Sequence, residues 1–299
     1  MKRIEIEDKP VFDKYKTPHI INSEYQFTTL FAWADRYNFC FHEFNNTLFV
    51  FGNQNNGALQ CYFPIGSESY HDSVEYVKNI FKERKMPFNM RPLSKEMLDK
   101  IRPFLNGDFT IGTKPSYTDY ICDFKTLSEY EGHSYKKKRK SAKSFYNKYD
   151  FQYVSLSIEN IECAIDGLYE ILSDSGQSID TDEWNAYLKI LNNFRALNLR
   201  GGMTIINGKV EAISVAESFY DSVIIHIRRC NKSFAGIYPA MLQQLLKNEF
   251  TDFDYKYVNL QDDMGIVNLR NTKLSYRPII LLNKYYVYEE SAENDCDSN

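Results

Sequence analysis

The stretch that decides the fold lies in the second half of the chain, where residues 203–229 read MTIINGKVEAISVAESFYDSVIIHIRR. Apolar and polar residues alternate in three runs, Met203–Ile206, Lys209–Glu217 and Ser222–Arg229, as they do in half-buried β-strands. Asn207-Gly208, between the first two runs, is the dipeptide that a two-residue type I′ hairpin turn prefers. The three runs therefore predict an antiparallel meander.

Helical and extended patterns continue on both sides of the meander. Before it we expect a basic helix over His133–Tyr149 and a strand over Phe151–Leu156. After it we expect a helix over Pro239–Phe250 and strands at Tyr255–Asn259 and Ile279–Tyr288. Mostly antiparallel strands, one β-α-β crossover and interleaved helices predict a mixed, twisted α+β sheet covered by helices.

The first half repeats this order of elements in a shorter form, which predicts two domains. A chain of 299 residues is long enough for two separate cores. We place the first domain at residues 1–116 and the second, which carries the candidate site, at residues 117–288. The acidic tail, residues 289–299, has the Ser- and Asn-rich composition of a disordered segment.

Charge and cysteine content narrow the function classes. A net charge of −4 gives no overall attraction to nucleic acid or anionic lipid, so such binding needs a local basic patch. The six cysteines are widely spaced, without the pairing typical of zinc sites or disulfide frameworks. The sequence has neither a signal-peptide pattern nor a long apolar run, so we expect a cytoplasmic protein. We also expect no metal and no tightly held cofactor.

A lysine-rich run near the middle of the chain predicts an amphipathic helix. Its apolar stripe includes Tyr135 and Ala142, whereas Lys136 and Lys137 lie outside the stripe. Arg139 falls within the stripe, four residues after Tyr135, so its guanidinium needs an anion. One candidate partner is an internal carboxylate. The other is the phosphate of a nucleotide, coenzyme A, tRNA or lipid head group.

The last strand of the meander leads into a second candidate site. Alternation places His226 and Arg228 on one face, where a half-buried structural role is the simpler interpretation of His226. The next loop enters a helix, an arrangement that offers backbone N–H groups to an anion. Its candidate binding residues are Lys232, Ser233, Gly236 and Tyr238. The alternative is an ordinary strand-to-helix turn with Pro239 in the first helical turn.

Polar residues also cluster between the strand that ends at Asn259 and a short helix beyond Asp263. Ligands in α/β structures bind where strands end. Arg270 and Lys273 lie one turn apart on the same side of that helix. Either these charges bind a ligand or they join the helix to the sheet. We expect Arg139, Lys232, Arg270 and Lys273 to face one cleft and one phosphate-bearing ligand.

The motifs resemble those of a known family, the C-terminal catalytic domain of phosphatidylglycerol lysyltransferases and the uncharacterised proteins related to it. The resemblance spans nearly the whole chain, and its segments occur in the same order. They are F-T-x-L-x-x-W at Phe27–Trp33, Y-x-K-K-R at Tyr135–Arg139, Gly236-Ile237-Tyr238, and N-x-x-x-D-x-G-x-x-x-L-R-x-x-K-x-S-Y-x-P at Asn259–Pro278.

This resemblance implies a tandem GNAT fold, as in the Fem aminoacyl transferases, and acyl transfer. Family members fused to a membrane flippase transfer lysine or alanine from charged tRNA to phosphatidylglycerol. This sequence has no apolar run long enough for such a membrane half, so any lipid contact is expected to be peripheral. Arg228-Arg229 and Leu260-Gln261 replace the family's usual Glu-Lys and Arg-Glu, changes that alter the expected ligand.

Two functions follow from these features. The first is an acyl- or aminoacyl-transferase that uses acyl-CoA or aminoacyl-tRNA and an amine or hydroxyl acceptor. In it Glu217 is the candidate base and Tyr276 a possible proton donor. The residues expected to hold phosphate groups are Arg139, Arg228, Lys232, Arg270 and Lys273. The alternative is a non-catalytic GNAT-like protein that recognises a phosphate-bearing ligand.

Overall fold

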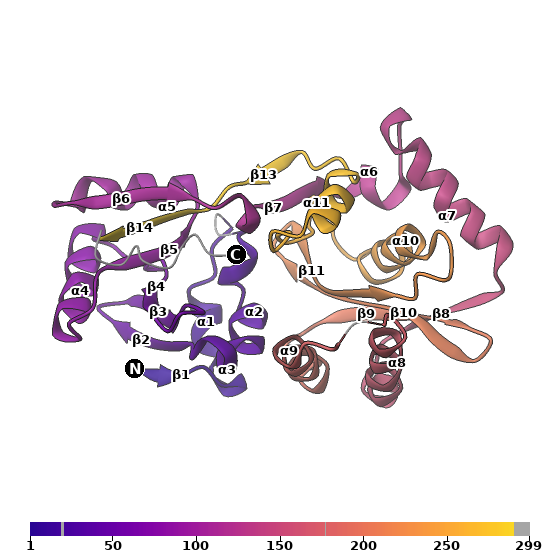
Figure 1. Cartoon of the computed structure of the whole chain (residues 1–299), viewed down its shortest axis with the longest axis horizontal. Helices are drawn as coiled ribbons and strands as arrows, with labels where there is room; N and C mark the ends of the chain where they lie inside the picture. The colour runs from indigo at the N-terminus through magenta and orange to yellow at the C-terminus, as the bar shows by residue number, and fades with distance from the viewer. Residues whose placement is uncertain (19–20, 177, 290–299) are drawn as a thin grey trace. The chain divides into compact units, whose positions relative to one another are not determined.

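The computed structural model describes residues 1–18, 21–176 and 178–289. They form two compact units (Figure 1). Unit 1 comprises Met1–Thr118 and the chain from Leu282 onward, and unit 2 comprises Asp119–Leu281. Within the described ranges each unit contains a mixed sheet of seven strands. The predicted disordered tail, apart from Glu289, lies outside the described residues.

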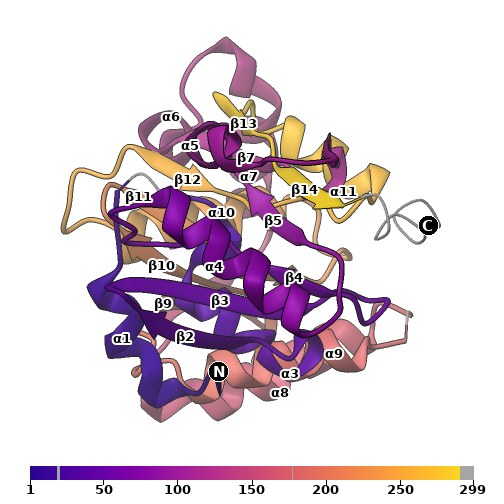
Figure 2. The same cartoon turned by 90° about the vertical axis from the view of Figure 1, so that its left-hand side faces the viewer.

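The sheet of unit 1 has the strand order β1-β2-β3-β4-β5-β14-β6. Its strands are β1 (Lys2–Arg3), β2 (Cys40–Phe44), β3 (Thr47–Asn53), β4 (Leu59–Cys61), β5 (Asn89–Leu93), β6 (Phe109–Thr113) and β14 (Tyr285–Glu289). Its helices are α1 (Lys9–Lys14), α2 (Phe27–Ala32), α3 (Ala34–Tyr37), α4 (Tyr70–Glu83) and α5 (Lys95–Ile101). Figure 2 shows α4 across this sheet, on which it buries Val74, Val77 and Phe81.

The C-terminal strand differs from the expectation. The sequence suggests one strand over Ile279–Tyr288 in the second domain, but the structure contains two, β13 (Ile280–Leu282) and β14. β14 pairs antiparallel with both β5 and β6 of unit 1. Lys284, between the two strands, is buried and forms an ion pair with Glu24 of unit 1. The chain therefore returns to the first sheet, where the apolar Val287 is fully buried.

The sheet of unit 2 has the strand order β13-β7-β12-β11-β10-β9-β8. The strands other than β13 are β7 (Asp119–Asp123), β8 (Phe151–Ser155), β9 (Arg200–Ile206), β10 (Lys209–Phe219), β11 (Ser222–Cys230) and β12 (Tyr257–Asn259). Its helices are α6 (Phe124–Glu129), α7 (Lys136–Lys148), α8 (Ile161–Ser173), α9 (Thr181–Asn192), α10 (Ile237–Glu249) and α11 (Val267–Leu274).

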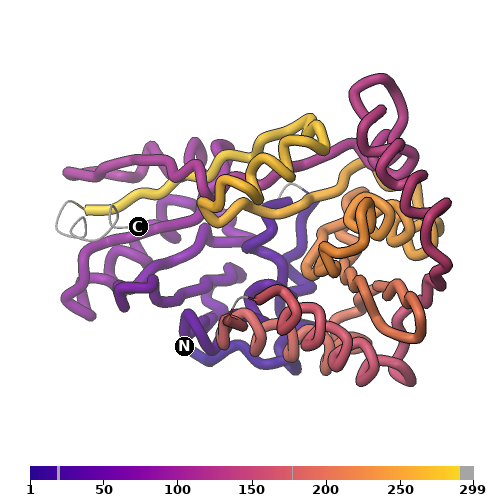
Figure 3. The backbone as a smooth tube through the Cα atoms, turned by 45° about the vertical axis from the view of Figure 1, so that its right-hand side comes forward, coloured from indigo at the N-terminus to yellow at the C-terminus, as the bar shows by residue number. Residues whose placement is uncertain are grey.

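The predicted meander is present in this sheet. β9, β10 and β11 pair antiparallel in chain order, with Asn207 and Gly208 at positive φ in the turn. α6, α7 and α10 cover one face and α8 and α9 the other, as Figure 1 shows. We call these the α10 face and the α8 face. Figure 3 shows α7 along the outer side of this unit, just before the chain enters β8.

The predicted β-α-β crossover is also present. β11 leads through Gly236 into α10, and the chain returns as β12, parallel to β11. Gly236 is the N-cap residue of α10 and has φ 89°. A Cβ atom at this position would lie 2.4 Å from the carbonyl oxygen of Ser141 on α7. Glycine is thus required both by the left-handed backbone and by the close approach of α7.

Replacing Gly236 by Ala should therefore destabilise unit 2. We expect a loss of about 2–4 kcal/mol in the free energy of unfolding, because backbone strain and a clash with a main-chain atom add together. Gly208→Ala is the matched control, since Gly208 has φ 77° but an added Cβ would meet nothing within 4 Å. Its expected loss is about 1 kcal/mol. Urea unfolding measures both, and equal losses would contradict the role of α7 packing.

Candidate functional site

Two neighbouring strands of unit 2 separate near the middle of the sheet. β11 and β12 pair only over Ser222–Ile224 and Tyr257–Asn259. Beyond Ile224, β11 continues to Cys230, whereas the chain after Asn259 turns through Gln261 and Met264, both at positive φ. The second half of β11 therefore has no parallel partner, and polar side chains gather beside it. Strained turns of this kind are common at functional sites.

An extra residue interrupts the alternation of β11. Val215 pairs with Ile227, but Ala216 pairs with Ile225, so His226 is the additional residue of a β-bulge. The predicted shared face of His226 and Arg228 is therefore wrong. Glu217, opposite Ile224 on the α8 face, accepts the hydrogen bond of His226. Arg228 lies on the α10 face with Cys230.

A hydrogen-bonded chain links three segments at the bulge. His226 Nε2 lies 2.8 Å from Glu217 Oε1, and Gln261 Nε2 lies 3.2 Å from His226 Nδ1. The Glu217 and His226 side chains are only 10% and 2% exposed. If the amide of Gln261 donates, Nδ1 is the acceptor and the His226 proton is on Nε2, directed at Glu217. Glu217, the predicted base, is thus oriented by a histidine that the sequence did not assign.

On the α10 face, two cationic side chains lie against one aromatic ring, and a third cation, Lys273, is near enough to Arg228 for the two charges to interact. Lys138 Nζ lies 3.9 Å from the ring centroid of Tyr276, and the guanidinium carbon of Arg228 lies 5.1 Å from it. Lys273, from α11, is buried and donates to the main-chain oxygen of Asp262. Arg228 Nη1 and Tyr276 Oη are buried, and neither has a partner among the described residues. We call Lys138, Arg228, Lys273 and Tyr276 the cation cluster.

Burial and mutual repulsion weaken the basicity of the two lysines. Desolvation, together with the charge of Arg228, lowers the pKa of Lys138 to about 8. Desolvation also lowers the pKa of Lys273 to about 8, with Arg228 adding to the decrease and Asp262 opposing it. Burial raises the pKa of Tyr276, which therefore remains a neutral hydroxyl.

Other predicted binding residues hold the turn after β12. Asp263 is buried and accepts hydrogen bonds from Arg270 Nε at 2.7 Å, from Arg270 Nη2 at 3.1 Å and from Tyr120. Asn259 donates to Asp119 and accepts from the backbone of Gln261. These residues join α11 and the turn to the sheet, which is the structural alternative that the sequence left open for Asp263.

The four cations expected to share one cleft are not brought together. Arg139 is exposed and donates to the carbonyl oxygens of Tyr130 and Gly132, where it caps the end of α6. Arg270 is paired with Asp263, and Lys232 is exposed in the β11–α10 loop beside the exposed Ser233. Only Lys273 belongs to the cation cluster. The hydrogen-bond acceptors of Arg139 are thus main-chain carbonyl oxygens. A carboxylate or a phosphate was the expected partner, because Arg139 fits the apolar stripe of the helix.

The remaining predicted residues lie along α7 and α10. Lys136 and Lys137 are exposed in the first turn of α7. Tyr238 is half-buried near Cys230 and Arg228, and burial raises the pKa of its hydroxyl. Gly236 contacts α7, so its lack of a side chain serves packing between the two helices.

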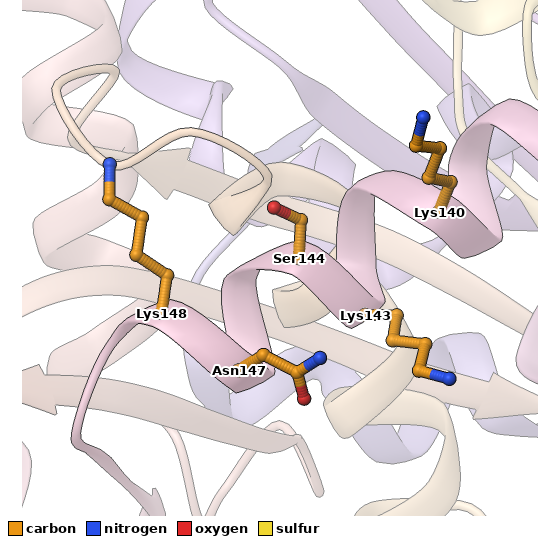
Figure 4. A pocket seen from close by; sticks show the side chains of 5 residues that line it. All are labelled: Lys140, Lys143, Ser144, Asn147 and Lys148. Atoms are coloured by element: carbon orange, nitrogen blue, oxygen red, sulfur yellow. The ribbon is translucent and has the colours of Figure 1, made fainter.

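The outer face of α7 bears a surface depression of about 530 Å³. Its lining comes from this one helix: Lys140, Lys143, Ser144, Asn147 and Lys148. Figure 4 shows that the three lysine side chains extend in different directions and do not converge on a common point. A solvated basic face explains this surface without a bound ligand.

Lys138 is the cation that the sequence interpretation missed. Positions 138 and 139 both fit the apolar stripe. Lys138 lies three residues after Tyr135 and four before Ala142, whereas Arg139 lies four residues after Tyr135 and three before Ala142. The structure places Lys138 against Tyr276 and leaves Arg139 exposed. The available signal was the 3-4-3-4 spacing that Lys138 completes with Tyr135, Ala142, Phe145 and Tyr149.

The described residues contain no group of three or more His, Cys, Asp or Glu side chains placed to hold a metal ion. Among the helices of the same residues, none has the length and apolar character needed to cross a membrane.

The lowered pKa of Lys273 predicts how stability varies with pH. The pKa of Lys273 is about 8 in the folded protein and takes the ordinary value of 10.5 in the unfolded chain. Between these pH values the unfolded chain therefore binds more protons than the folded protein. The free energy of unfolding should therefore rise with pH through this window, by at most about 1.4 kcal/mol per pH unit for this residue. Lys273→Met should remove the share of the rise that Lys273 contributes and leave the share of Lys138, whose pKa is also about 8.

Urea unfolding at about pH 7.5 and about pH 9.5 tests this dependence. Lys140→Met, at an exposed lysine of α7, is the control that should keep the wild-type rise. If Lys273→Met and the wild type gained equally, Lys273 would not be the group responsible.

Comparisons with known proteins agree with this architecture. A conserved protein of unknown function from Bacteroides thetaiotaomicron has 24% identity and a TM-score of 0.90, over 97% of this chain and 99% of that one. L-PGS from Bacillus licheniformis has 16% identity and a TM-score of 0.67, over 96% and 93%. FemX has 8% identity and a TM-score of 0.64, over 95% and 96%. A search of curated proteins gives no match.

The α+β architecture predicted from the sequence, two units that each contain a mixed, mostly antiparallel sheet with helices, is confirmed. The family profile described as "Phosphatidylglycerol lysyltransferase, C-terminal" matches residues 18–288. This match covers most of the chain and confirms the resemblance found in its motifs. The chain therefore belongs to the family of phosphatidylglycerol lysyltransferase C-terminal domains.

Proposed function

We propose that this protein is an acyl- or aminoacyl-transferase whose reacting groups lie beside the separation of β11 and β12 in unit 2. The observation that supports it most directly is the buried Glu217–His226 pair at the bulge. A carboxylate whose oxygen is held by a histidine ring nitrogen is a suitable proton acceptor. The family also favours transfer, since it is that of phosphatidylglycerol lysyltransferase C-terminal domains.

In the proposed reaction the acceptor is an amine or hydroxyl, and the donor is aminoacyl-tRNA or acyl-CoA. The acceptor nitrogen or oxygen forms a bond to the acyl carbon, and the bond from that carbon to the donor oxygen or sulfur breaks. Glu217 takes the proton that the acceptor loses and returns it to the leaving group. His226 acts as a positioning residue, because its Nε2–H fixes one oxygen of Glu217.

Tyr276 is better suited to binding than to proton donation. Burial raises the pKa of its hydroxyl, which makes it a weaker acid than an ordinary tyrosine. The hydroxyl oxygen is buried without a partner, and the neighbouring charges are the cations Lys138 and Arg228. We assign it as a hydrogen-bond donor to an anionic part of the substrate.

The role of Glu217 predicts a large loss of transfer in Glu217→Gln. The single-turnover rate should fall by about 10²–10⁴-fold, because the amide cannot accept the proton, while donor affinity should change little. Labelled lysyl-tRNA and labelled acetyl-CoA serve as donors, each with phosphatidylglycerol vesicles or glycinamide as acceptor. Glu211→Gln is the matched control: Glu211 lies on the same strand, is 8% exposed like Glu217, and bonds Asn231 instead.

Two results would decide against this proposal. Wild-type transfer rates in Glu217→Gln would remove Glu217 as the base. Binding of a donor without transfer to any acceptor would favour the non-catalytic, ligand-recognising alternative.

A further inference from the structure

The cation cluster contains an unsatisfied charge. Arg228 Nη1 is buried without a hydrogen-bond partner among the described residues. The side chains with the largest electrostatic effect on the pKa of Arg228 are Tyr276, Cys230, Tyr130 and Tyr238, and none of them is a carboxylate. A buried guanidinium nitrogen that has no hydrogen-bond acceptor is unfavourable. Arg139 and Arg270 show the contrast, because each has internal acceptors.

Two further cations increase the cost. The pKa of Lys138 responds to burial and to Arg228, and no acidic side chain contributes to it. Asp262 is the main acidic neighbour of Lys273; Asp263 and Asp119 also act on it, but Asp263 is bonded to Arg270 and Asp119 to Asn259. The cluster therefore combines three like charges with too few counter-charges. This arrangement lowers stability unless something negative binds to it.

Donor groups at the cluster come from three separate parts of unit 2. Lys138 belongs to α7, Arg228 to β11, and Lys273 and Tyr276 to α11 and the turn after it. Tyr135 Oη donates to the main-chain oxygen of Tyr276 at 2.6 Å, which fixes the start of α7 against this turn. A preformed set of donors on rigid elements is what a specific anion site requires.

We infer that Lys138, Arg228, Lys273 and the hydroxyl of Tyr276 bind a phosphate group. A phosphate dianion offsets two of the three positive charges, whereas a carboxylate offsets only one. Its several oxygens can accept from the guanidinium, the ammonium and the phenol together. Lys138 and Arg228 are half-buried, so each cation keeps part of its surface in contact with solvent.

This site differs from the basic outer face of α7. The outer lysines are exposed and come from one helix, whereas the cluster gathers cations around a fully buried tyrosine. It also differs from the Gly236 loop, which packs against α7. The inference deepens the proposed function, because it supplies the place where a phosphate-bearing substrate is held. It concerns binding alone and can fail or succeed independently of transfer.

Calorimetric titration of the full chain with inorganic phosphate tests the site. Lys138→Met should weaken phosphate affinity about tenfold or more, because a charge-assisted hydrogen bond is lost. Lys137→Met is the matched control, since Lys137 is the exposed neighbour on the same helix and the change in net charge is identical. It should alter affinity less than about twofold. Acetate at equal ionic strength should not compete.

Tyr276→Phe separates binding from folding. The change deletes one buried hydroxyl that has no partner in the free protein, so the thermal midpoint should stay the same or rise. Phosphate affinity should nevertheless fall several-fold. Competition by glycerol 3-phosphate or by adenosine 3′,5′-bisphosphate then identifies the source as a lipid-like or a nucleotide-like substrate, and either result supports the site.

Three outcomes would overturn the inference. They are equal weakening by Lys138→Met and Lys137→Met, unchanged affinity in Tyr276→Phe, and no phosphate binding by the wild type at millimolar concentration. Loss of transfer in Glu217→Gln with phosphate affinity intact would leave the two proposals separately tested.

Discussion

A single extra residue in β11 determines which side chains each face of the unit 2 sheet receives. Strand side chains alternate between faces, so an inserted residue reverses the pattern for everything that follows. His226 is that residue, and it remains with Glu217 on the α8 face. Arg228 is thereby transferred to the α10 face, beside Tyr276. Without the bulge, Arg228 would lie on the same face as Glu217 and His226, where its guanidinium would offset the negative charge of the Glu217 carboxylate.

Hydrogen-bond satisfaction separates structural charges from charges that remain available for a ligand. Asp263 and Arg270 form a closed pair that orders the turn after β12, and Arg139 completes the end of α6. Neither arrangement needs anything further. Arg228 and Tyr276 are different, because each retains a buried polar atom without a partner among the described residues. Since proteins rarely leave such atoms unsatisfied, these are the informative ones.

Local patterns predicted the parts of the fold that depend on neighbouring residues in the chain. Alternation and Asn207-Gly208 gave the meander, and a glycine before an apolar helix gave the crossover. The return of β14 to the first sheet depends on pairing with β5 and β6, nearly two hundred residues away, which no local pattern encodes. The bulge and the choice between Lys138 and Arg139 also depend on tertiary packing, because both lysine and arginine positions fit the same helical stripe.

The two proposed roles meet at the open edge of β11. Glu217 of β10 and His226 of β11 bond to each other on the α8 face, whereas Arg228, two residues further along β11, lies on the α10 face beside Tyr276. A substrate held by its phosphate at the cation cluster would therefore have to pass the edge at the point where β12 no longer pairs. Continuous pairing would close that route, since main-chain hydrogen bonds would fill the space between the strands. Under the two proposals, the separation of β11 and β12 would let a substrate bound on one face reach the reacting group on the other.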